Sequence, residues 1–190
     1  MAKLAAKTKK EEAPVAAEIV VDKNEKPIIF KAGDKVVYPP HGVGIIDSIE
    51  IRQVSGIQQR FYKITLLEKG DKVMAAVDRV RVIGLRKVIE PKAVEQVYDI
   101  LRDRKITLDT QTWNRRFREY NQKIKTGSVL EIAKVIRDLS VLKGDKELSF
   151  GERRMLESAQ GLLVQEISIA KSSSEEKVRK ELETMCQVAA

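Results

Sequence analysis

One change of residue pattern, near Arg86, constrains what this chain of 190 residues can fold into. Before that point, short segments rich in β-branched residues are separated by Pro, Gly, Ser and Asp, which are the residues of tight turns. After it, apolar residues recur every three or four positions, as they do along an amphipathic helix. The sequence therefore predicts an α+β protein in which the strands come first and the helices follow.

The first part predicts a small β-barrel of the SH3 or Tudor type. Pro39-Pro40 ends the first strand because proline cannot join the centre of a sheet ladder. Ser55-Gly56 is a hairpin signal, and Lys69-Gly70-Asp71 marks a second turn. We expect about four or five short strands here, a number typical of such barrels. The clearest segments are 35–38, 43–54, 60–67 and 73–77.

The second part predicts a compact bundle of about four to five helices. Pro91 stands where a first helical residue is expected, and a further helix begins near Trp113 and stops at Gly127. Later helices open with the capping-box spacing Ser-x-x-Glu, at Ser128/Glu131, Ser149/Glu152 and Ser173/Glu176. The expected divisions are a mobile N-terminal extension, a Tudor-like domain and a helical domain, at residues 1–27, 28–88 and 89–190.

The net charge of +8 is concentrated in two segments. Residues 29–90 carry 11 basic and 7 acidic side chains, and residues 113–125 carry 5 and 1, so each segment has a net charge of +4. A clustered positive charge is typical of a surface that binds a polyanion, although a solvated basic face has the same composition.

The composition argues against several other classes of protein. A single Cys, Cys186, and a single His, His41, provide no internal disulfide and no ligand cluster for zinc, so we interpret them as a packing residue and a turn residue. Apolar runs are too short for a membrane span or a signal peptide, so we expect a cytoplasmic protein. No nucleophile, base and orienting group stand in a recognisable order, so we expect no enzyme activity, cofactor or small-molecule substrate.

The most informative segment is the helix expected to begin at Trp113. At helical spacing one face carries Trp113, Phe117, Tyr120 and Ile124, the opposite face carries Arg115, Arg118, Gln122 and Lys125, and Arg116 and Lys123 lie between them. Two interpretations remain open. The aromatic side chains form either a buried stripe beneath a solvated basic face, or a surface whose first ring projects and stacks on a base of distorted DNA, beside guanidinium groups that contact phosphates.

Residues 28–190 resemble the CarD/CdnL family of bacterial RNA polymerase-binding transcription regulators. No single motif carries the resemblance, but the order and spacing of several motifs do. These motifs are FKAGDKVVYP at 30–39, GVG at 42–44, GLR at 84–86, TWNRR at 112–116, KTG at 125–127, RDL at 137–139 and LSFGER at 148–153. The sequence differs from the family pattern at Ala75-Ala76, where members often carry Arg or Ile-Pro, and at Asn121, where close relatives carry an apolar residue.

The resemblance implies a Tudor-like domain that grips the lobe of the RNA polymerase β subunit, and a helical domain that reaches promoter DNA at the upstream edge of the transcription bubble. Matched by position, the implied DNA-binding residues are the wedge residue Trp113 and the basic residues Arg115, Arg118 and Arg153, supported by Phe150, and the implied polymerase-binding residues are Arg52 and Val54. The basic segment adds Arg116 to the expected DNA-binding set and Lys123 and Lys125 to its support.

We therefore expect a non-enzymatic transcription regulator that binds polymerase and stabilises the open promoter complex without reading a particular sequence. The alternative from the basic segment is a stand-alone architectural protein that bends duplex DNA. A third hypothesis is an RNA-binding module built on the small barrel.

Overall fold

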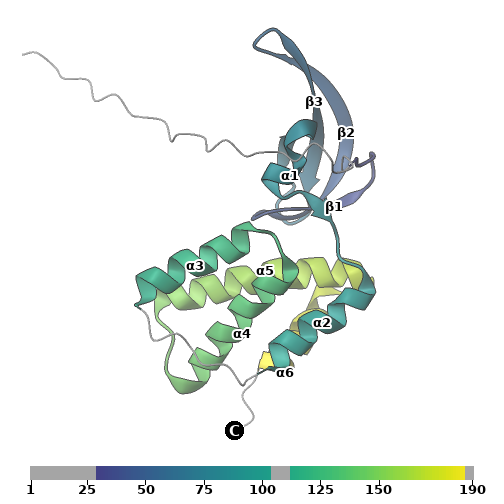
Figure 1. The fold of residues 1–190 in the computed structure, drawn as a ribbon. Helices are drawn as coiled ribbons and strands as arrows, with labels where there is room; N and C mark the ends of the chain where they lie inside the picture. The colour runs from purple at the N-terminus through teal and green to yellow at the C-terminus, as the bar shows by residue number, and fades with distance from the viewer. Residues whose placement is uncertain (1–28, 104–111, 187–190) are drawn as a thin grey trace, which may run out of the picture.

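The computed structural model describes residues 29–103 and 112–186, so the predicted N-terminal extension 1–27 lies outside the described residues. In the described residues the strands come first and the helices follow, which confirms the predicted α+β class (Figure 1). The strands are β1 (Lys35–Tyr38), β2 (Gly42–Val54), β3 (Ile57–Leu66), β4 (Lys72–Ala76) and β5 (Arg86–Lys87). Two short turns of helix, η1 (Val77–Arg79) and α1 (Val80–Ile83), follow β4. The bundle contains α2 (Pro91–Arg102), α3 (Trp113–Lys125), α4 (Val129–Asp145), α5 (Phe150–Lys171) and α6 (Glu175–Cys186).

The strands form one antiparallel sheet in the order β4-β3-β2-β1-β5. Within the described residues β4 and β5 remain the two edges, so the barrel that the sequence predicts is not closed. The reason is strand length, because β5 pairs only at Val36 and Val37 of β1, and β4 pairs only with residues 61–65 of β3. The sheet is a Tudor-like arrangement that stays open.

The sheet has its own small core, completed by the turn of helix after β4. Its buried members are Phe30, Val36, Ile46, Tyr62, Ile64, Ala75, Val80 and Leu85. The hydroxyl of Tyr62 accepts a hydrogen bond from the Phe30 amide at 3.1 Å, which satisfies a polar atom inside this core. Ala75 lies opposite Tyr62 in the ladder and is wholly buried. Its small side chain therefore packs in the core and is not part of the surface.

Strands β2 and β3 form a long hairpin that projects away from the bundle (Figure 1). Their pairing continues to Val54 opposite Ile57, and the two turn residues, Ser55 and Gly56, have φ values of 51° and 84°. Positive φ at both central residues is the requirement of a type I′ turn, whose twist suits a hairpin. A register shift between Ile46 and Ser48 separates the buried inner half of β2 from its mostly exposed outer half.

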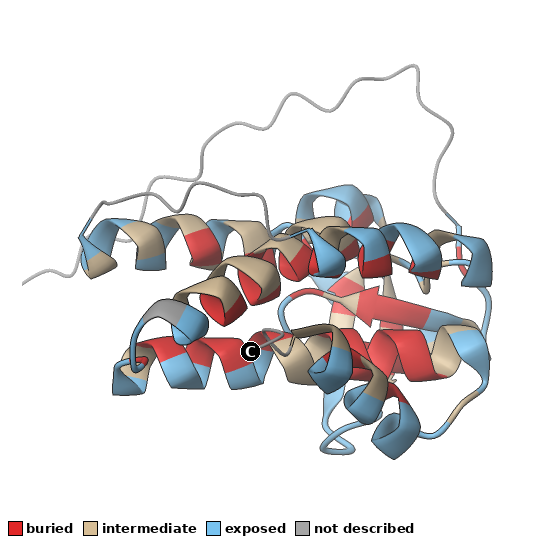
Figure 2. Ribbon diagram, turned by 90° about the horizontal axis from the view of Figure 1, so that it is seen from below, coloured by how far each residue is buried: buried red, intermediate tan, exposed pale blue. Residues whose placement is uncertain are grey.

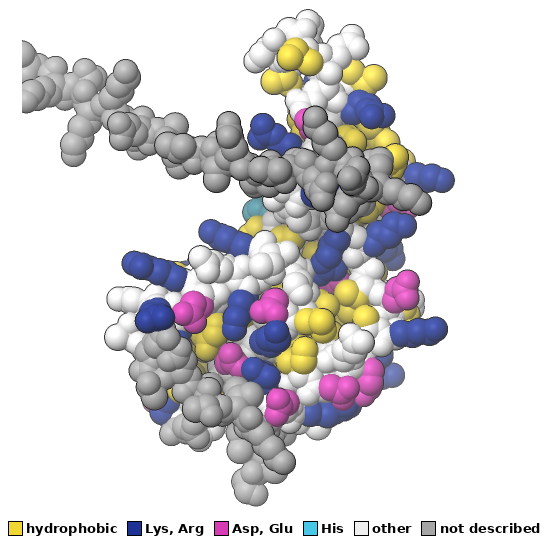
Figure 3. Space-filling model, in the orientation of Figure 1, with side chains coloured by type: hydrophobic (Ala, Val, Ile, Leu, Met, Phe, Trp, Pro, Cys, Tyr) yellow, Lys and Arg dark blue, Asp and Glu magenta, His cyan; other side chains and the backbone are white. Residues whose placement is uncertain are grey.

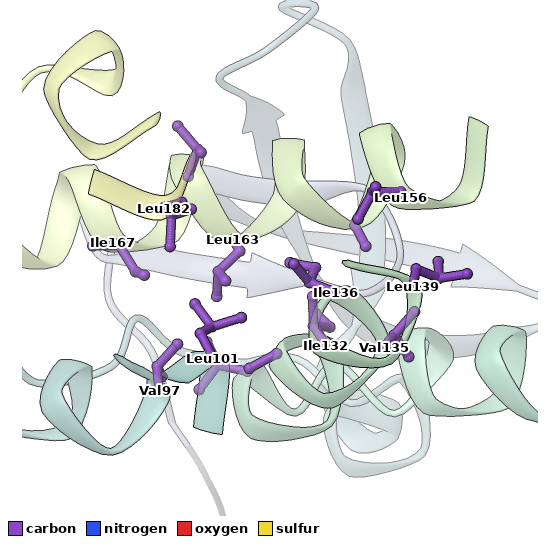
Figure 4. Close-up of a cluster of buried hydrophobic side chains, with 14 of the residues drawn as sticks. Val97, Leu101, Ile132, Val135, Ile136, Leu139, Leu156, Leu163, Ile167 and Leu182 are labelled. Atoms are coloured by element: carbon purple, nitrogen blue, oxygen red, sulfur yellow. The ribbon is translucent and has the colours of Figure 1, made fainter. Parts of the chain in front are cut away.

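Helices α2 to α6 surround a second, larger core (Figure 4). Figure 2 shows buried residues along one side of these helices and exposed residues along the other, as the helical period of the sequence predicts. Among the largest wholly buried side chains are Leu101, Ile136, Leu139, Leu163 and Ile167. Five helices in this part of the described chain agree with the predicted bundle.

One of the three predicted capping boxes forms. Ser149 Oγ accepts from the Glu152 amide, and the Glu152 carboxylate accepts from the Ser149 amide at 2.8 Å. At the start of α4, Ser128 makes no side-chain cap, and Glu131 pairs with Lys134. At α6 the capping hydroxyl belongs to Ser174 rather than Ser173.

The two residues interpreted as structural are found in structural settings. His41 is exposed in the turn between β1 and β2, and its ring stacks on Tyr38 with 5.4 Å between centroids. Cys186 ends α6 and packs, half-buried, against the bundle core.

Candidate nucleic-acid interface

Helix α3 has the two faces that its sequence pattern predicts. Tyr120 and Ile124 are buried on the core side, and burial raises the pKa of the Tyr120 hydroxyl to about 12. Arg115, Arg118 and Lys125 are exposed on the other side. These three basic residues are therefore presented to solvent by a helix that the aromatic side anchors.

Trp113 is half-buried at the edge of the bundle core. Its ring lies 5.3 Å from that of Phe117, measured between centroids. Gly151, in the first turn of α5, lies against the indole, because a Cβ at this glycine would stand 3.1 Å from Cζ2 of the tryptophan. One side of the ring therefore packs on α5, and part of the ring remains accessible.

More apolar and basic groups meet where α3 and α5 begin. Phe150 is 73% exposed and directly precedes Gly151, and Phe117 is 43% exposed. Arg153 is also exposed, with Glu147 Oε1 3.6 Å from its Nη1. We call this set the aromatic-basic surface, and its members are Trp113, Phe117, Phe150, Arg115, Arg118 and Arg153. It joins residues nearly forty positions apart in the sequence.

Arg116 has a different environment from the other arginines of α3. Its Nη2 lies 2.9 Å from Oε1 of Glu152, and the two side chains are 13% and 2% exposed. Burial by itself raises the pKa of Glu152, but hydrogen bonds from the amide and hydroxyl of Ser149 and the charges of Lys146 and Arg116 outweigh it and lower the pKa below its usual value. Glu152 is thus held as a carboxylate that caps α5 and pairs with α3.

Two of the remaining basic residues of α3, Arg115 and Lys123, have local partners. Arg115 pairs with Glu119 one turn later at 3.6 Å, an exposed contact of small energy. Lys123 is half-buried, with its ammonium 5.8 Å from the centre of the Tyr120 ring, whereas Lys125 points to solvent. The Asn121 amide donates to the Phe117 carbonyl at 3.0 Å, so its polarity is used within the helix.

The predicted polymerase-binding residues lie on the outer half of the hairpin. Arg52 is exposed, and its guanidinium donates twice to one oxygen of Glu50, at 2.9 and 3.2 Å. Hydrogen bonds from Arg52 and then Lys63 lower the pKa of Glu50. Val54 is 46% exposed, among the other exposed apolar residues of the hairpin, which are Ile49, Ile51 and Ile57. Figure 3 shows apolar side chains gathered near the end of the hairpin, away from the bundle.

Sequence reasoning missed the polar residues that join the sheet to the helical bundle, chiefly Gln165 and Glu166. Both are buried in the middle of α5. A signal was present, because these two polar residues interrupt the apolar run that extends from Leu162 to Ile167. A buried polar pair requires partners, and these partners lie on the sheet.

Residues 29–103 and 112–186 contain neither a candidate metal site nor a candidate membrane span. No group of three or more His, Cys, Asp and Glu side chains there is arranged to hold a metal ion. Every helix in the same residues is too short or too polar to span a bilayer.

Two protein-family models match the chain. Residues 30–89 match the CarD-like/TRCF RID domain, and residues 96–183 match the CarD C-terminal domain. The first match covers the sheet with its hairpin, and the second covers most of the bundle with the aromatic-basic surface. A chain that joins these two domains in this order is a transcription regulator.

A relative supports the same conclusion over four fifths of this chain. The putative transcription factor YdeB of Bacillus subtilis (strain 168) is 31% identical over 155 residues, which are 80% of this chain and 98% of the relative. The chain belongs to the CarD family.

Two solved structures resemble the N-terminal part. CdnLNt from Myxococcus xanthus is 42% identical, with a TM-score of 0.29, over 34% of this chain and 92% of that chain. The solution NMR structure of the 72-residue N-terminal domain of Myxococcus xanthus CarD is 38% identical, with a TM-score of 0.27, over 30% of this chain and 75% of that chain.

Proposed function

We propose that the protein docks on the RNA polymerase β subunit through its projecting hairpin and stabilises the open promoter complex through Trp113. The observation that carries this proposal is the setting of Trp113, a half-buried indole at the start of α3, whose opposite face exposes Arg115 and Arg118. A partly accessible ring on a basic helix can stack on an unstacked base while the helix contacts neighbouring phosphates. The upstream edge of the transcription bubble offers such a base.

Energetics favour a melted junction over intact duplex as the target. Wedging a side chain into a stacked step costs a few kcal/mol, and the cost is smallest where the duplex is already open. Stacking of a base on an aromatic ring contributes about 1–3 kcal/mol. Binding that prefers the open state by about 1.4 kcal/mol shifts the opening equilibrium tenfold. Trp113 therefore needs only a modest preference to prolong the open complex.

The outer hairpin supports the docking part of the proposal. Residues 49–60 of the hairpin belong to neither core of the described chain, yet they expose Ile51, Val54 and Ile57 beside Arg52. Apolar side chains with an arginine among them are typical of protein–protein contact surfaces. The match of this region to the CarD-like/TRCF RID domain agrees with a polymerase partner.

A gel-shift series with promoter DNA, with and without RNA polymerase, tests the proposal. We expect weak binding to DNA alone and strong binding to the polymerase–promoter complex. Tight binding to duplex without polymerase, falling steeply with salt, would instead support an architectural DNA-binding protein. Preference for structured RNA would support an RNA-binding module.

A further inference from the structure

A partly buried ion pair joins the sheet to the bundle. Arg86 on β5 reaches Glu166 in the middle of α5, with 2.8 Å between Nη2 and Oε2, and its Nη1 bonds the other carboxylate oxygen. Glu166 is 2% exposed. Two parallel bonds between planar groups fix their relative orientation as well as their distance.

All five N–H groups of the Arg86 guanidinium form hydrogen bonds. Besides its bonds to Glu166, it donates from Nε and Nη2 to the carbonyl of Gly127, between α3 and α4, and from Nη1 to the Lys87 carbonyl. An arginine has five N–H groups, whereas lysine offers three from one atom. Glu166 also accepts from the Ile89 amide at 3.1 Å. One side chain therefore ties β5, α5 and the turn after α3 together.

Two glycines allow the backbones to meet beside this ion pair. Gly127 has a φ of 69°, and a Cβ there would overlap Pro39 of the turn after β1. Gly42 has a φ of 92°, and a Cβ there would overlap the amide oxygen of Gln165. That oxygen accepts from the Val43 amide at 2.8 Å in a buried bond. Consecutive residues of α5 thus hold β2 and β5.

We propose that this junction, consisting of Arg86, Gly127, Gln165 and Glu166, is a positioning device that holds the hairpin and the aromatic-basic surface at one fixed separation. This inference rests on the proposed function, in which the hairpin docks and Trp113 meets the DNA. A flexible link raises local concentration only to about the millimolar range. A rigid link presents the ring at one place without an ordering cost on binding, so docking at one end stabilises contact at the other. Arg86 and Glu166 are positioning residues, since neither belongs to the two binding surfaces.

Distance measurement tests the structural half of this proposal. Spin labels on Ser55→Cys and Gln122→Cys, in the full chain with Cys186→Ser, report the separation of the hairpin turn from α3 by pulsed dipolar spectroscopy. We expect a single narrow distribution for the otherwise unchanged chain. Arg86→Ala and Glu166→Gln should broaden it, and Arg86→Lys should broaden it less, because lysine keeps the charge but loses the paired bonds. A distribution that stays narrow in Arg86→Ala overturns the proposal.

Promoter kinetics test the functional half. At saturating protein, we expect Arg86→Ala and Glu166→Gln to lose most of the gain in open-complex half-life while their affinities for polymerase and for forked DNA stay unchanged. If the distance distribution broadens but the half-life of the open complex does not fall, the positioning role is overturned. Gln165→Ala, which removes one hydrogen bond and leaves no buried charge, keeps the test valid if thermal melting shows Arg86→Ala unfolded.

A matched control variant checks the specificity of the effect, and one further outcome separates failure of the proposed function from failure of the junction proposal. Arg102→Ala removes exposed ion pairs of α2 with Glu95 and Asp99 and should change neither distance nor half-life. If the unchanged protein leaves the half-life unaltered, the proposed function fails, and the distance measurement still decides whether the junction sets the separation.

Discussion

Arg116 and Glu152 form a buried ion pair, 2.9 Å long, between the two helices that carry the aromatic-basic surface. The same carboxylate caps α5 through Ser149. Trp113 lies three residues before Arg116, and Gly151, which supports the indole, directly precedes Glu152. We infer that this pair sets where the ring lies on α5, so Arg116 acts through the position of α3, whereas Arg115 and Arg118 are exposed.

Arg116→Ala and Arg153→Ala therefore separate stability from DNA contact. Removing Arg116 leaves the buried Glu152 carboxylate with only Ser149 and the more distant Lys146 as partners among the described residues, so Arg116→Ala should lower the free energy of unfolding by up to about 3–5 kcal/mol. Arg153→Ala removes an exposed side chain and should change it by less than about 0.5 kcal/mol. In titrations with forked DNA, Arg153→Ala should instead weaken binding. The slope of the logarithm of the binding constant against the logarithm of salt concentration should fall by about one, the value for one lost phosphate contact. Urea unfolding of both variants checks the contrast, and equal destabilisation would contradict it.

The lowered pKa of Glu152 predicts how the stabilisation of the folded chain by the Arg116–Glu152 pair depends on pH. Its pKa in the folded chain lies below 4.5, its usual value, because the bonds from Ser149 and the nearby positive charges outweigh burial. The stabilisation is thus fully present above pH 4.5 and is lost as pH falls through the folded pKa. Urea midpoints of the unchanged chain and Glu152→Gln should converge in acid. A difference that is constant with pH, or one matched by the exposed Glu183→Gln, would refute the assignment.

Gly151→Ala tests whether Gly151 sets the position of the Trp113 ring. Because an added Cβ would press on the ring at 3.1 Å, we expect the ring to move outward. Trp113 is the only tryptophan, so its fluorescence should shift to longer wavelength and its quenching by iodide should increase. Gly161→Ala is the matched control, since that Cβ meets nothing within 4 Å. It should leave the fluorescence unchanged and stabilise the helix by up to about 1 kcal/mol. Identical spectra for both variants would show that Gly151 does not support the ring.

The sequence predicted those features that depend on local pattern. The division into strands and helices, the hairpin at Ser55-Gly56 and the capping box at Ser149 each follow from neighbouring residues. The open sheet was not predicted, because closure depends on the lengths of β4 and β5.

The candidate site was predicted in part for the same reason. The two faces of α3 follow from helical spacing, but the contact of Trp113 with Gly151 joins distant segments. Likewise, helical spacing places Arg116 between the faces of α3, and its burial depends on Glu152 in another helix.

Trp113→Ala tests the wedge. Losing a stacking contribution of about 1–3 kcal/mol should shorten the open-complex lifetime by about 5- to 150-fold, while capture by polymerase stays unchanged. Stopped-flow measurement of promoter opening and collapse provides the lifetime. Val82→Ala, which removes an exposed apolar side chain outside both surfaces, is the control and should have no effect. An unchanged lifetime in Trp113→Ala would reject the wedge.

Arg52→Glu tests the hairpin as the docking surface. The substitution places a second carboxylate beside Glu50, with which Arg52 now pairs, so the net charge of the hairpin residues 42–66 changes from +1 to −1. Pull-down by the polymerase β lobe should be lost, while binding to forked DNA should stay unchanged because the aromatic-basic surface lies on the bundle. Lys69→Glu makes the same change of net charge in the turn before β4 and should keep the pull-down. If Arg52→Glu is captured as well as Lys69→Glu, the docking surface lies elsewhere. If both variants lose capture, overall charge rather than the hairpin governs the encounter.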